Sequence, residues 1–355
     1  MVSAVLFITF FVLLVLNVPI SVCLGLSSAA AILYSGTSLT IVATNIYSGI
    51  SKFLLLAIPF FVLSGNIMAK AGISTRLIRF VDTCVGHRKG GIANVCIIVA
   101  CFFGAISGSG PATVAALGAV LIPAMIERGG FSAAFSTALM ATSSSIAIVI
   151  PPSIAFVVYA SITGVSIGDM FMAGIIPGIL MGLALVVVVM LEVRRNHVVP
   201  SNVEKASAKE RWNAFKDAFW GFLMPVIILG GIYGGIFTPT EAAAVSVVYG
   251  LFVGMIIYKE VKFKDLWEIL IDSAKTTGGI MLIVACASLF SFVCTRFGIS
   301  TAASELLARV AGNQFTFLLI CNIIFLIAGC FIDANSAMYI FIPIMLPVCK
   351  ALGYN

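Results

Sequence analysis

Hydrophobic residues along this chain are gathered into long runs that short polar connections separate. A helix that crosses a bilayer needs about 20 predominantly apolar residues. Runs close to this length lie at 3–18, 20–36, 53–69, 92–106, 112–126, 132–163, 172–191, 217–237, 241–258, 276–295, 315–332 and 336–349. The pattern predicts an all-α protein that crosses a membrane many times, with a break inside the run at 132–163.

Two further segments, 73–85 and 262–275, place charged residues on one helical face and Leu, Ile, Phe or Trp on the other. This pattern is typical of interfacial helices, which lie along the membrane surface. The alternative is that each segment simply extends a neighbouring transmembrane helix.

Composition agrees with a membrane protein. The chain is 61% hydrophobic and 10% charged, with a mean hydropathy of +1.18, whereas soluble domains carry about 25% charged residues. The first run lacks a preceding basic region and another apolar run follows it at once, so we interpret it as a retained helix rather than a signal peptide. The net charge of +6 does not indicate nucleic-acid binding, because the basic residues flank apolar runs.

The basic residues also predict an orientation, since cytoplasmic loops of membrane proteins are enriched in Lys and Arg. If the loop at 86–91 is cytoplasmic, alternation of the runs places all but four of the 20 basic residues on that side. The exceptions are Lys52, Arg296, Arg309 and Lys350. We therefore expect the N-terminus outside.

Two distant stretches share landmarks in the same order. Gly-Ile-Ser-Thr at 72–75 recurs at 298–301, and three further residues recur in order: Gly86 as Gly312, Pro123 as Pro347 and Gly129 as Gly353. Gly86 opens a basic loop whereas Gly312 opens an uncharged one, so the two copies are expected to have opposite orientations. The sequence therefore predicts an inverted repeat, an arrangement typical of secondary transporters.

The repeat gives a domain organisation. The first copy covers 1–195, a cytoplasmic linker covers 196–216, and the second copy covers 217–355, with predicted helical hairpins at 92–126 and 315–349. The first copy continues through the broken helix, whereas the second ends soon after Gly353. We therefore expect the chain to be truncated at its C-terminus, without the second broken helix.

Small polar residues interrupt each hairpin at mid-depth. Glycine weakens a helix and proline favours its first turn, so the string at 107–111 ends one helix and begins another. The residues of this first tip are Ser107, Gly108, Ser109, Gly110, Pro111 and Thr113. Irregular backbone survives in a bilayer only where it faces protein or a wet cavity, so the tip is predicted to line a site. A small-residue helix contact is the alternative.

A second group of small polar residues accompanies the break at 132–163. Its members are Thr142, Ser143, Ser144, Ser145, Pro151, Pro152 and Ser153. Proline removes a backbone donor and clashes with the preceding turn, so this segment is expected to break and to expose carbonyls. Together with the first tip it would supply several hard oxygen ligands, which suit an alkali cation better than a transition metal. A simple proline kink is the alternative.

The second tip contains the most deeply placed acidic residue. Its members are Asp333, Ala334, Asn335 and Ser336. An ionisable residue within a membrane segment is a functional candidate, so Asp333 is predicted to bind a cation or a proton, and helix capping is an equal alternative. Glu241 is predicted to cap the N-terminus of the following helix.

Other chemistries find little support. The nine cysteines have no metal-type spacing, and His87 and His197 flank apolar runs. We therefore expect no transition metal and no organic cofactor. An intramembrane serine hydrolase would need a base near Ser107 or Ser109, and no histidine lies in a predicted span. A channel would need a continuous polar file, whereas the polar residues here cluster at mid-depth.

Several motifs in order resemble those of a known family. They are AIPFFVLSGNIM at 57–68, GHRKGG at 86–91, SGSGPAT at 107–113, IPPSIAFVVYA at 150–160, FMAGIIPG at 171–178, FTPTEAAAV at 237–245 and PIMLP at 343–347. This combination resembles the large membrane subunit of tripartite ATP-independent periplasmic (TRAP) transporters over essentially the whole chain.

The resemblance implies an elevator-type, sodium-coupled importer of organic acids in the bacterial inner membrane. It implies two partners, a small four-helix membrane subunit and a periplasmic substrate-binding protein, and substrates such as C4-dicarboxylates, sialic acid and other sugar or keto acids. By this resemblance one sodium site uses Ser107 to Ser109 with Ser143 to Ser145, and a second uses Asp333 to Ser336. A self-sufficient carboxylate carrier of related fold is the alternative.

Overall fold

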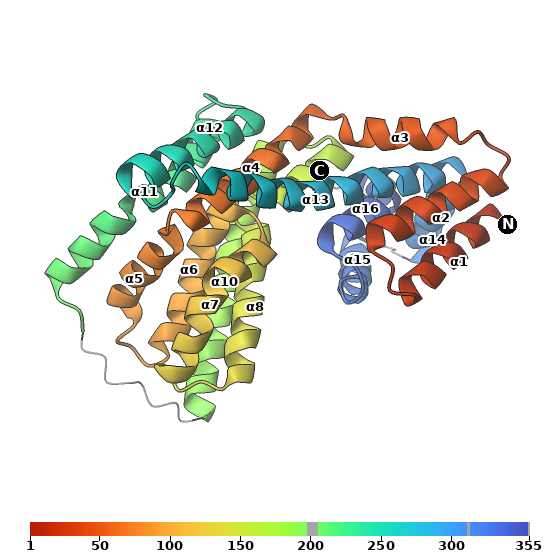
Figure 1. Ribbon diagram of the computed structural model, residues 1–355. Helices are drawn as coiled ribbons and strands as arrows, with labels where there is room; N and C mark the ends of the chain where they lie inside the picture. Colours follow the sequence, from red (N-terminus) through yellow and green to blue (C-terminus); the bar gives the residue numbers. More distant parts are fainter. Residues whose placement is uncertain (197–204, 311–312, 354–355) are drawn as a thin grey trace. The chain divides into compact units, whose positions relative to one another are not determined.

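The computed structural model describes residues 1–196, 205–310 and 313–353, and it is helical with no strand in these ranges (Figure 1). Within these ranges, seven helices are long and apolar enough to cross a membrane, or eight if one bent pair forms a single span. Each apolar run of the sequence coincides with one of the helices or with the bent pair. The prediction of an all-α membrane protein is therefore confirmed.

The chain forms two compact units, which we describe separately. The first unit comprises Met1–Leu55, Val158–Gly164 and Thr276–Asn355, and the second comprises Leu56–Val157 and Val165–Lys275. The helices of the first unit are α1 (Val2–Val15), α2 (Ile20–Tyr34), α3 (Thr40–Ile50), most of η1 (Phe53–Leu56), α14 (Ile299–Val310), α15 (Gln314–Ala328) and α16 (Ala334–Ala351). The helices of the second unit are α4 (Ala57–Lys70), α5 (Ile73–Val85), α6 (Gly91–Ser107), α7 (Gly110–Glu127), α8 (Ala133–Val149), α10 (Ile167–Arg195), α11 (Ala208–Tyr233), α12 (Pro239–Leu251) and the π-helix η2 (Phe252–Ile257). Two helices, α9 (Ile154–Thr163) and α13 (Asp265–Arg296), contribute to both units.

The second unit is built around α6, which packs against α7, α8 and α10 (Figure 1). Small residues permit this packing: a Cβ atom added at Gly104 of α6 would lie 2.7 Å from the Cα atom of Ala147 in α8. Close backbone approach through small residues is the usual way in which helices associate within a membrane. The same contact brings the C-terminal end of α6 towards the end of α8.

Aromatic rings join α5 to the neighbouring helices of the second unit. The Phe80 ring of α5 meets the Phe222 ring of α11 edge to face at 5.4 Å, and Phe222 meets Phe102 of α6 at 4.9 Å in the same way. Edge-to-face contacts of this kind add stability beyond the buried area. The amphipathic segment at 73–85 is thus a separate helix, as predicted, and its apolar face packs on α6 and α11.

The prediction of a separate interfacial helix at 262–275 is wrong. Residues 265–275 are the first turns of α13, which continues without a break to Arg296, because no proline interrupts the sequence. Polar contacts attach this part to α4: the Asn66 Nδ2 atom donates to Ser273 Oγ at 2.8 Å, and Lys70 pairs with Glu268 at 3.1 Å. The extension of a neighbouring helix, the alternative interpretation, is correct here.

The linker predicted between the two copies is shorter in the structure, because α11 begins within it. Residues 208–216, which the sequence assigned to the linker, begin α11, where a capping box between Ser207 and Glu210 fixes its start. His197 and residues 198–204 of that linker lie outside the described residues.

A second capping box confirms the capping prediction for Glu241, whose carboxylate accepts from the backbone N–H of the N-cap residue Thr238 at 2.8 Å. The sequence missed α3, which is only 11 residues long and carries several polar residues.

The two stretches that the sequence predicts to be copies of a repeat share local structure. Gly72 (φ 67°) precedes α5 and Gly298 (φ 71°) precedes α14, so the same left-handed residue begins an amphipathic helix in each copy. Each amphipathic helix is then followed by two helices joined through a polar tip. Gly312 lies outside the described residues. The common order of elements fits a duplication, and the opposite orientation of the copies stays a prediction.

Candidate functional site

The first tip lies between α6 and α7 in the second unit. Helix α6 ends at Ser107, Gly108 adopts the left-handed conformation at φ 60°, and α7 begins after the N-cap residue Ser109, whose Oγ accepts from the Ala112 N–H at 3.5 Å. Pro111 occupies the first turn of α7, where its missing N–H costs nothing. The predicted hairpin with a Ser-Gly tip is thus present.

Buried hydroxyl groups link the two arms of this tip. Ser107 Oγ lies 3.1 Å from Thr113 Oγ1, which in turn donates to the Ser109 carbonyl at 2.8 Å. Ser107 is 3% exposed and Thr113 is fully buried. The tip therefore holds hydroxyl and carbonyl oxygens together in a place that water does not reach from the surface of the second unit.

The broken helix meets the same place. Helix α8 ends at Val149 and α9 begins at Ile154, with a bend of 44° between them. The connection contains Pro151 and Pro152, and the buried Ser153 hydroxyl donates to the Ile148 carbonyl at 2.5 Å. Ser153 therefore satisfies a carbonyl that the end of α8 leaves without a helical partner.

Gly108 is the point of contact between the tip and the break. Its carbonyl accepts from the Ile154 N–H at 3.4 Å. A Cβ atom added at Gly108 would lie 2.7 Å from the Pro152 carbonyl oxygen, closer than real Cβ atoms come. Glycine is thus required for two reasons, a positive φ and the close approach of another backbone.

The serines before the break do not themselves form it. Thr142, Ser143, Ser144 and Ser145 all lie within α8, so their backbone groups are helical, unlike the exposed carbonyls that the sequence suggested. Ser143 and Ser144 are buried, and the Ser144 carbonyl faces Gly110 of the first tip, 3.3 Å from an added Cβ atom there. Thr142 and Ser145 are exposed on the second unit. Within this serine group, it is the Ser144 carbonyl that the structure brings to the tip.

Ser143 has an unusual environment. Its side chain is fully buried, and its polar neighbour is the Cys96 thiol, a weak hydrogen-bond partner. Its Oγ makes no stronger hydrogen bond within the described residues. A buried hydroxyl with so weak a partner costs free energy, so its oxygen atom has capacity left for a ligand.

The helix ends give the site backbone groups with partial charges of both signs. The C-terminal ends of α6 and α8 present carbonyl groups, and the N-terminal ends of α7 and α9 present N–H groups. Carbonyl ends attract cations and N–H ends attract anions. The described residues contain no group of three His, Cys, Asp or Glu side chains that suits a metal ion. The arrangement is thus suited to an alkali cation and an anion side by side.

Helix α4 adds residues that the sequence analysis did not select. A Cβ atom added at Gly65 would lie 3.2 Å from the Ser107 Cα atom, so α4 packs directly on the first tip. The neighbouring Ser64 is fully buried, and its Oγ has no hydrogen-bond partner within the described residues. The sequence signal was a Ser-Gly-Asn string inside an apolar run, the same kind of interruption that marked the tips.

The second tip lies in the first unit, between α15 and α16. Asp333 is the N-cap of α16: its carboxylate accepts from the backbone N–H groups of Asn335 at 3.0 Å and Ser336 at 3.3 Å, and also from the Ser336 hydroxyl. Ala334 begins the helix, and the buried Asn335 Oδ1 atom has no partner within the described residues. The structure thus supports the capping interpretation of Asp333 and leaves the Asn335 amide oxygen available.

The capping role of Asp333 gives a testable expectation. Asp333→Asn retains a good N-cap, so we expect an unchanged apparent melting temperature and largely unchanged transport, whereas Asp333→Ala is expected to cost about 1 kcal/mol of stability. Thermal unfolding and uptake of both variants would be measured together. Loss of ion coupling in a stable Asp333→Asn variant would instead assign the carboxylate to a cation or proton.

Comparison with known proteins identifies the family. The family described as "Tripartite ATP-independent periplasmic transporter, DctM component" matches residues 7–355. The C4-dicarboxylate TRAP transporter large permease protein DctM of Rhodobacter capsulatus is 38% identical over 359 residues, which cover 97% of this chain and 81% of the relative. The protein of the same name from Pseudomonas aeruginosa is 41% identical, over 94% of this chain and 77% of its own length.

A third relative has a longer chain. The isethionate TRAP transporter permease protein DctMQ of Oleidesulfovibrio alaskensis is 38% identical over 352 residues, which cover 99% of this chain and 55% of the relative. The family match extends over nearly the whole chain, and the relatives are similar across nearly all of it. The chain belongs to the DctM family, the large permease component of TRAP transporters.

Proposed function

We propose that this chain is the membrane-embedded translocating subunit of a sodium-coupled importer of organic acid anions. One observation carries the proposal: a hairpin tip and a broken helix meet through Gly108 in a buried place lined by hydroxyl groups. Family membership supports transport as the general activity and argues against an enzyme.

Sodium is proposed as the coupling ion because the ligands at this place are neutral oxygen atoms. The hydroxyls of Ser107 and Thr113 and the carbonyls at the ends of α6 and α8 are hard donors, which suit small alkali and alkaline-earth cations. The buried Ser143 hydroxyl within α8 is proposed as a further oxygen ligand. A second sodium site is proposed at the second tip, with the Asn335 amide oxygen, which lacks a partner within the described residues, as a ligand. Asp333 holds this tip as the cap of α16.

Coupling between the cation and the anion would follow from the contact between the first tip and the broken helix. A cation held between the first tip and the break fixes the distance between them and so orients the N–H ends of α7 and α9 towards the anion. An anion bound there raises the affinity for the cation by the same factor, because coupling between two sites is reciprocal. Transport then requires both ligands, as a symporter does.

Substrate and partners are proposed from the relatives. Relatives are named for C4-dicarboxylates and for isethionate, which share an acidic group and a small polar body. We propose a substrate of this class, delivered by a periplasmic binding protein, and a small membrane subunit as a second partner in the bacterial inner membrane. The DctMQ relative supports the second partner, since this chain covers 55% of its length.

The movement is proposed to be of the elevator type, with a rigid bundle carrying the substrate between oppositely oriented repeats.

A self-sufficient carboxylate carrier is the second candidate function. The two differ in one respect: only the first requires a binding protein. Purification of the chain together with a small membrane protein, and uptake that depends on an added binding protein, would separate them.

Uptake by proteoliposomes tests the proposal. The full-length protein and its small membrane partner would be reconstituted, and labelled C4-dicarboxylate would be added with candidate binding proteins under an inward sodium gradient. We expect uptake that needs both the gradient and a binding protein, and no uptake when potassium replaces sodium. Equal uptake in potassium would refute sodium coupling, and uptake without any binding protein would favour the self-sufficient carrier.

A further inference from the structure

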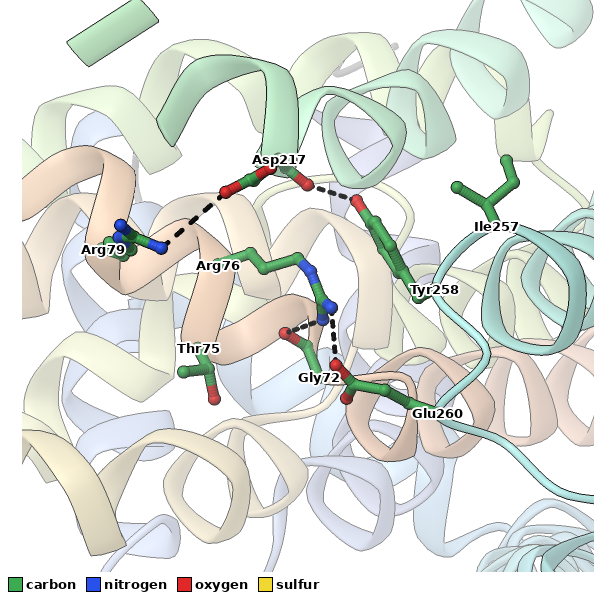
Figure 2. Close-up of a pocket in the computed structure, with 8 residues that line it drawn as sticks. All are labelled: Gly72, Thr75, Arg76, Arg79, Asp217, Ile257, Tyr258 and Glu260. Atoms are coloured by element: carbon green, nitrogen blue, oxygen red, sulfur yellow. Dashed lines mark hydrogen bonds and ion pairs between the residues drawn. The ribbon is translucent and has the colours of Figure 1, made fainter. Parts of the chain in front are cut away.

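A polar pocket of about 430 Å³ lies in the second unit, away from the tip and the break (Figure 2). Its walls come from the start of α5, the first half of α11 and the segment that follows η2. The charged residues that line it are Arg76, Arg79, Asp217 and Glu260. Two positive and two negative side chains therefore share one cavity, which is unusual for a chain with so few charges.

One of the two arginines is already fully engaged. Arg76 pairs with Glu260 at 2.5 Å, donates to the carbonyls of Ala71 and Gly72 at 3.1 Å each, and places its guanidinium 3.8 Å from the centre of the Tyr258 ring. These contacts are drawn in part in Figure 2. Arg76 thus forms the fixed wall of the pocket and holds the end of α4 in place.

The other charged pair is loosely arranged. Arg79 Nη1 lies 3.8 Å from Asp217 Oδ2, which is beyond hydrogen-bond distance, and the two side chains are 72% and 56% exposed. The Asp217 backbone is held, because the Tyr258 hydroxyl donates to its carbonyl at 2.5 Å. The Arg79 and Asp217 side chains therefore offer unused hydrogen-bonding capacity of opposite sign, and the backbone of Asp217 is held in place.

This charge pattern selects a zwitterion. A pocket with balanced charges gives no net attraction to a simple anion, whereas a ligand with a phosphate and an ammonium group satisfies both side chains. The guanidinium of Arg79 is suited to a phosphate, and the exposed Thr75 lines the same wall. Asp217 accepts hydrogen bonds only, so it favours an ammonium that carries N–H groups over a methylated one.

The position of the pocket favours a lipid as the source of this ligand. It lies at the ends of the apolar helices α4 and η2, and the charge asymmetry of the sequence places Arg76 and Arg79 at the cytoplasmic surface. Trp212 and Phe219 of α11 expose 57% and 38% of their surface nearby in the sequence, and aromatic side chains of this kind are enriched at the headgroup level. Pockets with basic side chains between membrane helices on the cytoplasmic side are known to bind lipid headgroups.

We propose that this pocket binds the headgroup of phosphatidylethanolamine, with the phosphate on Arg79 and Thr75 and the ammonium on Asp217. The site is independent of the proposed sodium and substrate sites. Its occupant would fix α5 against α11 and the segment after η2, because the contacting residues come from these elements.

Competition among lipids provides the first test. The purified, delipidated complex would be titrated with phosphatidylethanolamine, phosphatidylcholine and phosphatidylglycerol of identical acyl chains, and bound lipid would be counted by native mass spectrometry. We expect phosphatidylethanolamine to bind about tenfold more tightly than either of the others, as for one charge-assisted hydrogen bond. Equal binding of the ethanolamine and choline lipids, or strongest binding of phosphatidylglycerol, would overturn the proposal. So would equal affinity for soluble glycerophosphoethanolamine, since the ligand would then not be a lipid.

Two substitutions give a second test, because each is expected to change the lipid preference in a different way. Asp217→Asn removes the ammonium partner, so we expect loss of the ethanolamine preference together with a gain in phosphatidylglycerol binding. Arg79→Gln removes the phosphate partner, so binding of both lipids is expected to fall. The controls are Glu127→Gln and Arg88→Gln, exposed residues outside the pocket that remove the same charges. Equal lipid profiles for all four variants would contradict the assignment, and the wild-type competition decides the matter if a variant fails to fold.

Discussion

Replacing Gly108 with alanine is expected to abolish sodium-dependent uptake. The residue has a φ of 60°, which costs a non-glycine residue about 1–2 kcal/mol. Its added Cβ atom would also lie 2.7 Å from the Pro152 carbonyl oxygen. Because the obstacle is backbone, relief requires separation of the tip from the break, and the proposed cation ligands then lose their spacing.

Gly235→Ala provides a matched control for this prediction. Gly235 has nearly the same φ, 68°, but no atom lies within 4 Å of its added Cβ position. Both alanine variants therefore carry the backbone strain of a positive φ, but only Gly108→Ala places a Cβ atom too close to another part of the backbone. Uptake in proteoliposomes and the apparent melting temperature would be measured for both variants. If the two lose uptake equally, the contact between Gly108 and the broken helix has no special role.

Replacing Ser143 with alanine is expected to separate stability from sodium binding. The Ser143 Oγ atom is buried, and its polar neighbour is the Cys96 thiol, a weak hydrogen-bond partner. Its removal should therefore leave the sodium-free protein as stable as before, or more stable by about 1 kcal/mol. The stabilisation that sodium adds should shrink, because one proposed ligand is lost. Both the stability without sodium and the stabilisation by sodium would be obtained from melting temperatures measured across a sodium titration. A potassium titration is the control.

The neighbouring Ser145 supplies the control. It belongs to the same serine group but is exposed on the second unit, so Ser145→Ala is expected to change neither the stability nor the sodium dependence. An equal weakening by both substitutions would show that the whole serine group acts, and an unchanged sodium response in Ser143→Ala would exclude this hydroxyl as a ligand.

Much of the fold followed from simple patterns. Apolar runs located the spanning helices, since the bilayer sets their length. The Ser-Gly-Ser-Gly-Pro string located the first tip, because glycine and proline act on the backbone locally. The capping role of Glu241 followed from its position three residues after Thr238, a relation that depends only on neighbouring residues.

Features that depend on neighbours in space were predicted less well. The segment at 262–275 has an amphipathic pattern typical of a surface helix, yet it continues into α13 and contacts α4 through Asn66 and Lys70. The contribution of Ser64 was missed, because nothing in its own segment shows that α4 packs on the first tip. The short helix α3 was missed since it lacks the length and the apolar character that marked the others.

By itself, the sequence determined that this is an all-α membrane protein, and it located the long apolar helices and the two tips, because hydropathy and backbone preferences are carried by local residues. Only the tertiary structure decided which serines face the first tip, that Gly108 meets the backbone at Pro152, and that Arg79 and Asp217 share a pocket. Those facts depend on how helices distant in sequence pack, and packing is fixed by the shapes of both partners together.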